Sequence, residues 1–319
     1  MKQFLFLIWM MAAAAGLWAQ QETQYTQFMH YKLGLNPAYA GNSGSIELAG
    51  LVRNQWMGIE GSPQTQLLSF SLPLVNNRVG LGANILRKTI GVTSEYTLET
   101  AYAYRIPVPR GYLGLGLMGS VRMLRIDYSQ LQGTQPIDQD GAVPVDVQSK
   151  LVPNFGAGIY YSGQNFYFGV SVPRLLNSNI DLADGDGTIS RDVSHLYIMG
   201  GVELQAGEGL ALEPQFLLKL VSGAPLDLDI NLMGHFGPRF RTGLSYRLGG
   251  SAGTGFGESA ALLVGADLTP QVQLGLAYDL TLSQLRDFSS GSLEIMMRCL
   301  LQRKASSDDD TETDSPRFF

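Results

Sequence analysis

The chain has 319 residues, of which 45% are hydrophobic and only 16% are charged. The charged fraction is well below the roughly 25% of an ordinary soluble domain. The formal net charge of −6 gathers near the C-terminal end, and the near-neutral remainder excludes the basic surface that nucleic-acid binding requires.

Residues 4–19 are the one span that is apolar enough for a membrane helix, and they follow Lys2. A basic residue, an apolar stretch and small residues before polar Gln20 are the order of a secretory signal peptide. We predict cleavage after Ala19, with an uncleaved anchor helix as the alternative. Cys299 is the single cysteine, so no intrachain disulfide and no cysteine-based zinc cluster is expected.

Beyond the signal peptide the chain alternates between apolar and polar residues in about fourteen segments bounded by turn residues. The predicted strands are 45–54, 64–74, 78–87, 94–106, 111–126, 153–161, 165–173, 194–205, 210–220, 226–235, 239–248, 259–268, 272–280 and 292–300. No amphipathic helical pattern of useful length interrupts them.

The two faces of these strands differ consistently. Within 94–106, Glu95, Glu99 and Arg105 share one face, opposite Leu98 and Tyr102. A charged face opposite an apolar face, repeated after a signal peptide, predicts an all-β fold: a transmembrane antiparallel β-barrel of the outer membrane with about 14 strands. A secreted sandwich is the alternative, because its strands alternate too.

The connections alternate in length as well. Those after even-numbered strands are short, for example 107–110 and 269–271, whereas several after odd-numbered strands are long, for example 127–152 and 174–193. Outer-membrane barrels have short periplasmic turns and long external loops. The parity therefore predicts that both termini lie in the periplasm of a Gram-negative bacterium.

Several motifs resemble ligand-binding or metal-binding sites but are explained more simply as parts of the strands and loops. Residues 114–119 match a dinucleotide fingerprint by letter, but the strand pattern continues where that motif needs a helix, so we expect its glycines to leave an uncrowded lumen face. The acidic loops 138–141 and 184–187 lack calcium ligands at their end positions. The three histidines are too scattered for a metal site. We therefore expect no enzyme, no metal and no cofactor.

Two non-alternating stretches near the N-terminus stand apart from the barrel pattern. Trp56, the only tryptophan after the signal peptide, is placed by the parity in the first external loop, as an interfacial anchor or as part of a fixed loop that meets a partner. The residues of these stretches that we single out as candidates for partner binding or for plugging the lumen are Asn36, Pro37, Tyr39, Arg53, Asn54, Gln55, Trp56, Gly58 and Pro63.

The stretches Asn-Pro-Ala-Tyr-Ala-Gly at 36–41, Arg-Asn-Gln-Trp-Met-Gly at 53–58 and Gly-Ser-Pro-Gln-Thr-Gln at 61–66 resemble the PorP/SprF family of type IX secretion and gliding membrane proteins. The resemblance continues to the last strand. Family members usually end near that strand, whereas this chain adds the acidic residues 301–319.

Composition and strand pattern predict four segments: a signal peptide (1–19), a periplasmic or plug segment (20–44), the barrel (45–300) and an acidic, disordered tail (301–319). The resemblance covers nearly all of the chain after the signal peptide. It implies a non-enzymatic protein that helps to export secreted cell-surface adhesins and to anchor them on the outer face. It also implies links to periplasmic components of the secretion system or to peptidoglycan-linked components, and outer-membrane lipid around the barrel. The runner-up is a diffusion channel, whose lumen Asp227, Asp229, Glu203 and Glu213 would make cation-selective. An outer-membrane lipid hydrolase is the third class, and it would need a Ser–His pair.

Overall fold

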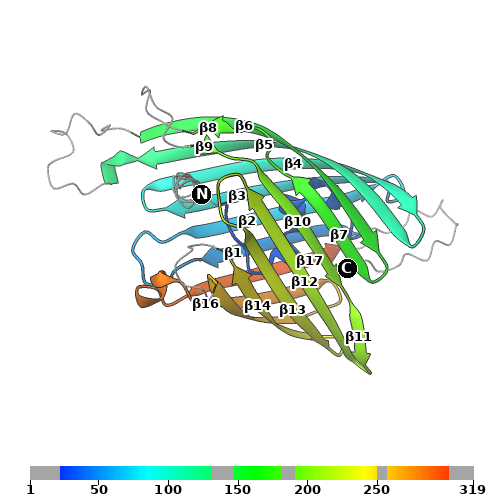
Figure 1. The fold of residues 1–319 in the computed structure, drawn as a ribbon. Coiled ribbons are helices and arrows are strands. Elements are labelled where there is room, and N and C mark those ends of the chain that lie inside the picture. Colours follow the sequence, from blue (N-terminus) through cyan, green and yellow to red (C-terminus); the bar gives the residue numbers. More distant parts are fainter. Residues whose placement is uncertain (1–21, 131–146, 181–190, 250–256, 302–319) are drawn as a thin grey trace, which may run out of the picture.

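Strands with one apolar and one polar face close into a barrel in the computed structural model, which describes residues 22–130, 147–180, 191–249 and 257–301 (Figure 1). Its strands are β1 (Ile46–Asn54), β2 (Gln64–Leu74), β3 (Val79–Ile90), β4 (Thr93–Val108), β5 (Gly111–Asp127), β6 (Val147–Gly163), β7 (Phe166–Val172), β8 (Ser178–Asn179), β9 (Arg191–Asp192), β10 (His195–Val202), β11 (Leu204–Gly207), β12 (Leu210–Val221), β13 (Asp227–Phe236), β14 (Phe240–Leu248), β15 (Ser259–Asp267), β16 (Val272–Thr281) and β17 (Ser292–Leu301).

The sheet closes in two places. Antiparallel pairing of β1 with β17 joins the first and last strands of the barrel, with Ile46 opposite Leu301 and Asn54 opposite Leu293. The 15-stranded sheet is sealed on the other side where β10 pairs with both β7 and β12. Since β10 and β11 are successive halves of one strand on β12, the barrel has fourteen strands, and the predicted fold is confirmed.

The alternation separates a lipid-facing surface from a filled interior. Leu98 and Leu117 are 51% and 65% exposed on the outside, whereas Glu99 is 1% exposed on the inside. Outer-membrane barrels have an apolar outer band that contacts lipid and polar residues that face the lumen. No helix in the part of the chain that the structure describes is long and apolar enough to cross a membrane.

The two rims of the barrel differ. We call the rim with the short connections, where β1 begins and β17 ends, the turn end; we call the opposite rim, where β1 leads into residues 55–63, the loop end. β5 and β6 continue their pairing to Asp127 and Val147 at the loop end, so β6 begins earlier than the predicted residue 153. Residues 148–150 are polar, and a two-stranded ribbon outside the lipid needs no apolar face, so alternation could not reveal this extension.

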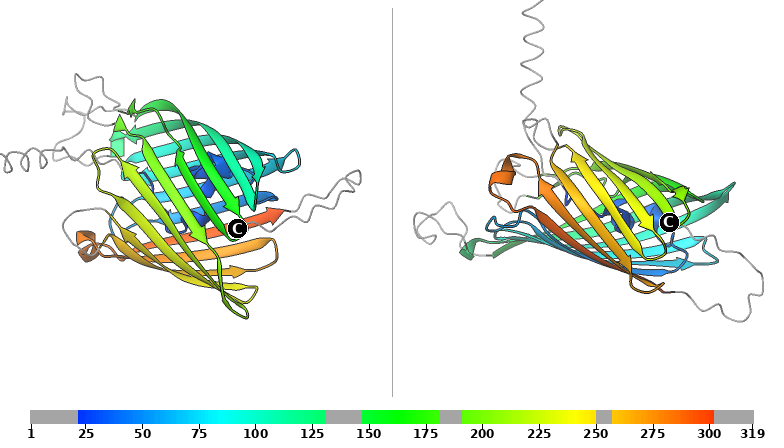
Figure 2. Two further views of the ribbon diagram at one scale, coloured as in Figure 1. Left: turned by 45° about the vertical axis from the view of Figure 1, so that its right-hand side comes forward. Right: turned by 90° about the horizontal axis from the view of Figure 1, so that it is seen from below.

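Short helices occur outside the strands. Three of them, η1 (Phe28–His30), α2 (Lys32–Leu35) and η2 (Pro37–Tyr39), precede β1, while η3 (Tyr128–Gln130) and η5 (Gln284–Asp287) lie at the loop end. Figure 2 shows the N-terminal segment, in blue, inside the barrel. The predicted signal peptide and the residues after Leu301 lie outside the described residues.

Candidate functional site

The segment before β1 runs through the lumen from one rim to the other. Glu22 lies at the loop end, where its carboxylate pairs with Arg174 and, at 2.9 Å, with Arg122. At the turn end, the Gly41 amide donates to Ser71 Oγ at 2.7 Å, just before the chain enters β1. Phe28 between them is fully buried and packs in one cluster with the inward side chains of the barrel. We call residues 22–44 the lumen segment.

Glycines on the inner wall receive the Asn-Pro-Ala-Tyr-Ala-Gly part of the lumen segment. A Cβ on Gly116 would lie 2.1 Å from the Ala38 nitrogen, and a Cβ on Gly80 would lie 1.9 Å from the Ala40 oxygen. Two further inward glycines, Gly114 and Gly158, meet the same stretch. From alternation alone we expected the glycines of 114–119 to leave an uncrowded lumen face, and this expectation is wrong. Backbone from the lumen segment fills the space next to Gly114 and Gly116.

Asn36 fixes the lumen segment to the wall by polar contacts. Its Oδ1 accepts from the Ala38 amide at 3.0 Å and so caps η2, while its Nδ2 donates to the Ile159 carbonyl at 2.9 Å. The residue is fully buried. Pro37 and Tyr39 are buried beside it, so these three candidates of the sequence analysis contact the barrel wall and one another.

Arg53 lies at the centre of a buried ion-pair cluster on the opposite wall. Its guanidinium contacts Asp279 Oδ2 at 2.6 Å and Glu294 Oε2 at 3.0 Å, and it donates to Thr26 Oγ1 at 2.9 Å. Glu294 also accepts from the amides of Thr26 and Gln27, at 3.0 and 2.8 Å. Two carboxylates and one guanidinium therefore hold the lumen segment where β1, β16 and β17 lie side by side.

A second cluster fastens the start of the lumen segment at the loop end. Arg174 bridges Glu22 to Glu99, whose carboxylate is 2.9 Å away, and Arg122 reaches Glu22, Glu95 and Asp192. Burial raises the pKa of the Glu22 carboxyl, but the Arg174 and Arg122 guanidinium groups outweigh it and hold that pKa well below its usual range. Glu22 is thus ionised at neutral pH.

A third cluster lies on β12, β13 and β14. Lys219 contacts Asp227 and Asp229 at 3.2 and 2.9 Å, and Arg247 contacts Asp229 at 2.5 Å. Gln24 of the lumen segment donates to Asp227 at 2.8 Å. Two of the four carboxylates that we expected to make an open lumen cation-selective, Asp227 and Asp229, are therefore paired with neighbouring cations, and Asp227 also accepts from the lumen segment. Glu213 meets His235 at 3.1 Å, and Glu203 accepts from Gln205 at 3.0 Å.

The remaining candidates lie outside the lumen at the loop end: Asn54 ends β1, and Gln55, Trp56, Gly58 and Pro63 belong to the first loop. Gln55 donates its amide to the Pro63 carbonyl at 2.9 Å, and Met57 exchanges backbone hydrogen bonds with Gly291 and Ser290. Trp56 has a left-handed backbone, with φ of 52°, and Gly58 has φ of 97°. Asn54 is exposed and Pro63 is buried. This loop is held against residues 288–291, and of the Arg-Asn-Gln-Trp motif only Arg53 turns into the lumen.

The other motifs remain without a ligand-binding arrangement. Among the described residues no group of three or more His, Cys, Asp or Glu side chains is placed to hold a metal ion. The acidic loops 138–141 and 184–187, which we expected to be external turns, lie outside the described residues. His195 stacks on Tyr197, with 6.1 Å between ring centroids, as a residue of the inner wall.

Sequence reasoning missed the partners of the lumen segment, namely the inward glycines and the charged residues Arg122, Arg174, Lys219 and Arg247. The signal was available in part. Glycines recur at inward positions of β3, β5 and β6, and that recurrence indicates a wall built for close backbone approach.

The model of one protein family, described as type IX secretion system membrane protein PorP/SprF, matches residues 17–299. The chain belongs to this family. As a PorP/SprF barrel it is an outer-membrane protein of the type IX secretion system. No curated protein sequence matches the chain.

Solved structures share the architecture of this PorP/SprF protein. The toluene transporter TbuX of Ralstonia pickettii is 10% identical, with a TM-score of 0.51 over 85% of this chain and 93% of that one. The outer membrane protein Omp33 of Acinetobacter baumannii is 8% identical, with a TM-score of 0.47 over 81% of this chain and 98% of that one. At 10% identity the likeness to TbuX concerns the fold alone.

Proposed function

We propose that this PorP/SprF protein is a non-enzymatic scaffold that helps to export and hold secreted adhesins at the loop end and links them to periplasmic secretion or peptidoglycan-linked components at the turn end. The observation that carries the proposal is the lumen segment, which joins Glu22 at one rim to Gly41 at the other. Outer-membrane barrels have short periplasmic turns and long external loops, so in this proposal the loop end faces outward and the turn end faces the periplasm.

The filled lumen favours a scaffold over a diffusion channel. The segment is anchored by buried ion pairs at Arg53 and at Glu22, and releasing it would leave several charges without partners. The barrel can thus serve as a scaffold that presents a surface at each rim. The first loop adds a fixed outer surface, since backbone hydrogen bonds tie it to Pro63 and to residues 290–291.

Adhesin display tests the outer half of the proposal. Trp56→Ala, together with Pro63→Ala, is expected to reduce the amount of adhesin on intact cells by severalfold while the barrel level stays unchanged. Tyr102→Ala is the matched control, because this ring faces lipid on β4 and is 46% exposed. Equal display in both variants, at equal barrel levels, would show that the first loop does not contact the cargo.

Conductance and native purification test the inner half. The intact barrel is expected to be silent in a planar bilayer and to be recovered with periplasmic proteins after gentle detergent extraction. Deletion of residues 22–42 is expected to open the pore and to reduce that recovery. A conducting intact barrel that is purified without partners would favour the diffusion channel instead.

A further inference from the structure

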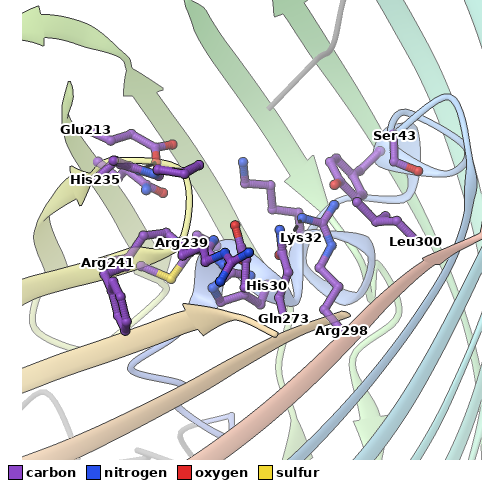
Figure 3. A pocket seen from close by; sticks show the side chains of 17 residues that line it. His30, Lys32, Ser43, Glu213, His235, Arg239, Arg241, Gln273, Arg298 and Leu300 are labelled. Carbon is purple, nitrogen blue, oxygen red and sulfur yellow. Dashed lines mark hydrogen bonds and ion pairs between the residues drawn. The ribbon is translucent and has the colours of Figure 1, made fainter. Parts of the chain in front are cut away.

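A cationic pocket lies at the turn end, beside the point where the barrel ends. Its volume is about 260 Å³, far above the roughly 10–15 Å³ that one water needs. Four cationic side chains line it, and they outnumber its two carboxylates. The cations are Lys32, Arg239, Arg241 and Arg298, and the carboxylates are Glu213 and Asp267. Figure 3 shows Lys32, Arg241 and Arg298 around this space.

Two of these cations lack a carboxylate partner. Arg241 pairs with Asp267, and Arg298 pairs with Glu47 at 2.9 Å. Lys32 is 4% exposed, and its ammonium makes no ion pair with the residues that the structure describes; it lies 3.6 Å from the centre of the Tyr167 ring. Arg239, on the exposed turn between β13 and β14, likewise makes no ion pair within the described ranges.

The same ammonium also lies 5.9 Å from the centre of the Tyr39 ring. A buried ammonium that faces aromatic rings and has no paired carboxylate is a costly arrangement unless an anion joins it. The lumen segment holds Lys32 in this position, because α2 is anchored by η2 and by Asn36. The pocket therefore favours an anionic occupant.

We propose that the acidic run at 308–314 of this chain binds in the pocket, with its carboxylates facing Lys32 and Arg239. The run contains Asp308, Asp309, Asp310, Glu312 and Asp314. Leu300 lines the pocket, and β17 ends at Leu301. Seven further residues, at about 3.3–3.6 Å each, reach about 25 Å, which is ample to turn back into the pocket.

Tethering makes this occupant more effective than a free anion. A short flexible linker gives an attached group an effective concentration in the millimolar range. In the proposed bound state, residues that follow β17 would lie against the part of the lumen segment near Lys32, at the turn end. The proposal concerns one rim of the barrel and does not rest on the adhesin role.

Zero-length cross-linking of the full chain in detergent tests the proposal. A carbodiimide activates a carboxyl group, and the Lys32 amine then displaces the urea to form an amide. Lys32 is the one lysine that lines the pocket. We expect mass spectrometry to find an amide between Lys32 and one of residues 308–314, and we expect none from Lys88, which lies toward the loop end of β3.

Variants keep the test independent of folding. Arg239→Gln, on an exposed turn, is expected to lower the Lys32 cross-link at least fivefold, and Asp308→Asn with Asp309→Asn and Asp310→Asn to do the same. Raising the salt to 1 M should also lower the yield, because the attraction is screened. Lys32→Arg removes the amine but keeps the charge, and serves as the blank.

Three outcomes would overturn the proposal. The first is a folded barrel with no link between Lys32 and residues 308–314. The second is a yield that Arg239→Gln leaves unchanged. The third comes from mixing isotope-labelled and unlabelled protein: links that join the two in statistical proportion would identify a second copy as the occupant.

Discussion

Arg53 of β1 and Glu294 of β17 face each other in register, and their side chains form a buried ion pair with 3.0 Å between Nη1 and Oε2. The pair therefore spans the seam where the first and last strands close the barrel. Because Glu294 also accepts from the Thr26 and Gln27 amides, closure of the barrel and placement of the lumen segment depend on the same carboxylate.

We expect Arg53→Met to destabilise the barrel by roughly 3–5 kcal/mol, since Asp279 and Glu294 would be left buried without a cation. Urea unfolding of protein refolded into vesicles measures the loss. Arg53→Lys keeps the charge but not the forked geometry, and should lose less. A loss below about 1 kcal/mol for Arg53→Met would contradict a structural role for this cluster.

We expect Gly116→Ala to displace the lumen segment, because the added Cβ would lie 2.1 Å from the Ala38 nitrogen. Trypsin reports the displacement, since Lys32 is the one cleavage site within 22–44 and is buried. Cleavage after Lys32 should rise severalfold. Gly119→Ala on the same strand is the control: its Cβ would meet nothing closer than 3.6 Å, and cleavage should not change.

The described chain begins and ends at opposite rims, with Glu22 at the loop end and Leu301 at the turn end. The start of the lumen segment therefore lies away from the periplasmic rim at which strand parity predicts both termini. With the loop end facing outward, an epitope placed directly before Glu22 should be labelled by antibody on intact cells. An epitope after Leu301 should be labelled only after the outer membrane is permeabilised. The reverse pattern would invert the proposed orientation, and labelling of both on intact cells would contradict passage of the segment through the lumen.

Lys32 is expected to make stability depend on pH. Burial, with a smaller contribution from Arg298, lowers the pKa of its ammonium from 10.5 to about 8, although Glu213 opposes the shift. The unfolded chain then holds this proton more tightly, so Lys32 costs stability below pH 8 and the cost is relieved between pH 8 and 10.5. Relative to Lys32→Met, the unfolding free energy of a chain without residues 302–319 should rise by about 3 kcal/mol over that range.

The same measurement on the full chain bears on the acidic run. Carboxylates next to Lys32 favour its charged form and raise its pKa. The rise in unfolding free energy between pH 8 and 10.5 should therefore be smaller with residues 302–319 present. Identical curves for the two chains would mean that these residues leave the Lys32 ammonium unaffected.

Local alternation in the sequence is enough to predict the wall of the barrel. Alternation at Leu98, Glu99 and Tyr102 assigns outer and inner faces correctly, and the number of strands follows, because a period of two is a local property that each strand shows alone. The motifs around Asn36 and Arg53 indicated the family, which the match over residues 17–299 confirms.

The content of the lumen, by contrast, depends on contacts that form only in the closed barrel. Arg53 and Trp56 are three residues apart, yet one joins the buried ion pairs and the other the loop rim. Glu22 meets Arg174, and Thr26 meets Asp279. These contacts join residues that are about 150 to 250 positions apart, and local periodicity has no means of recording them, since closure of the sheet is what brings the distant strands around one segment.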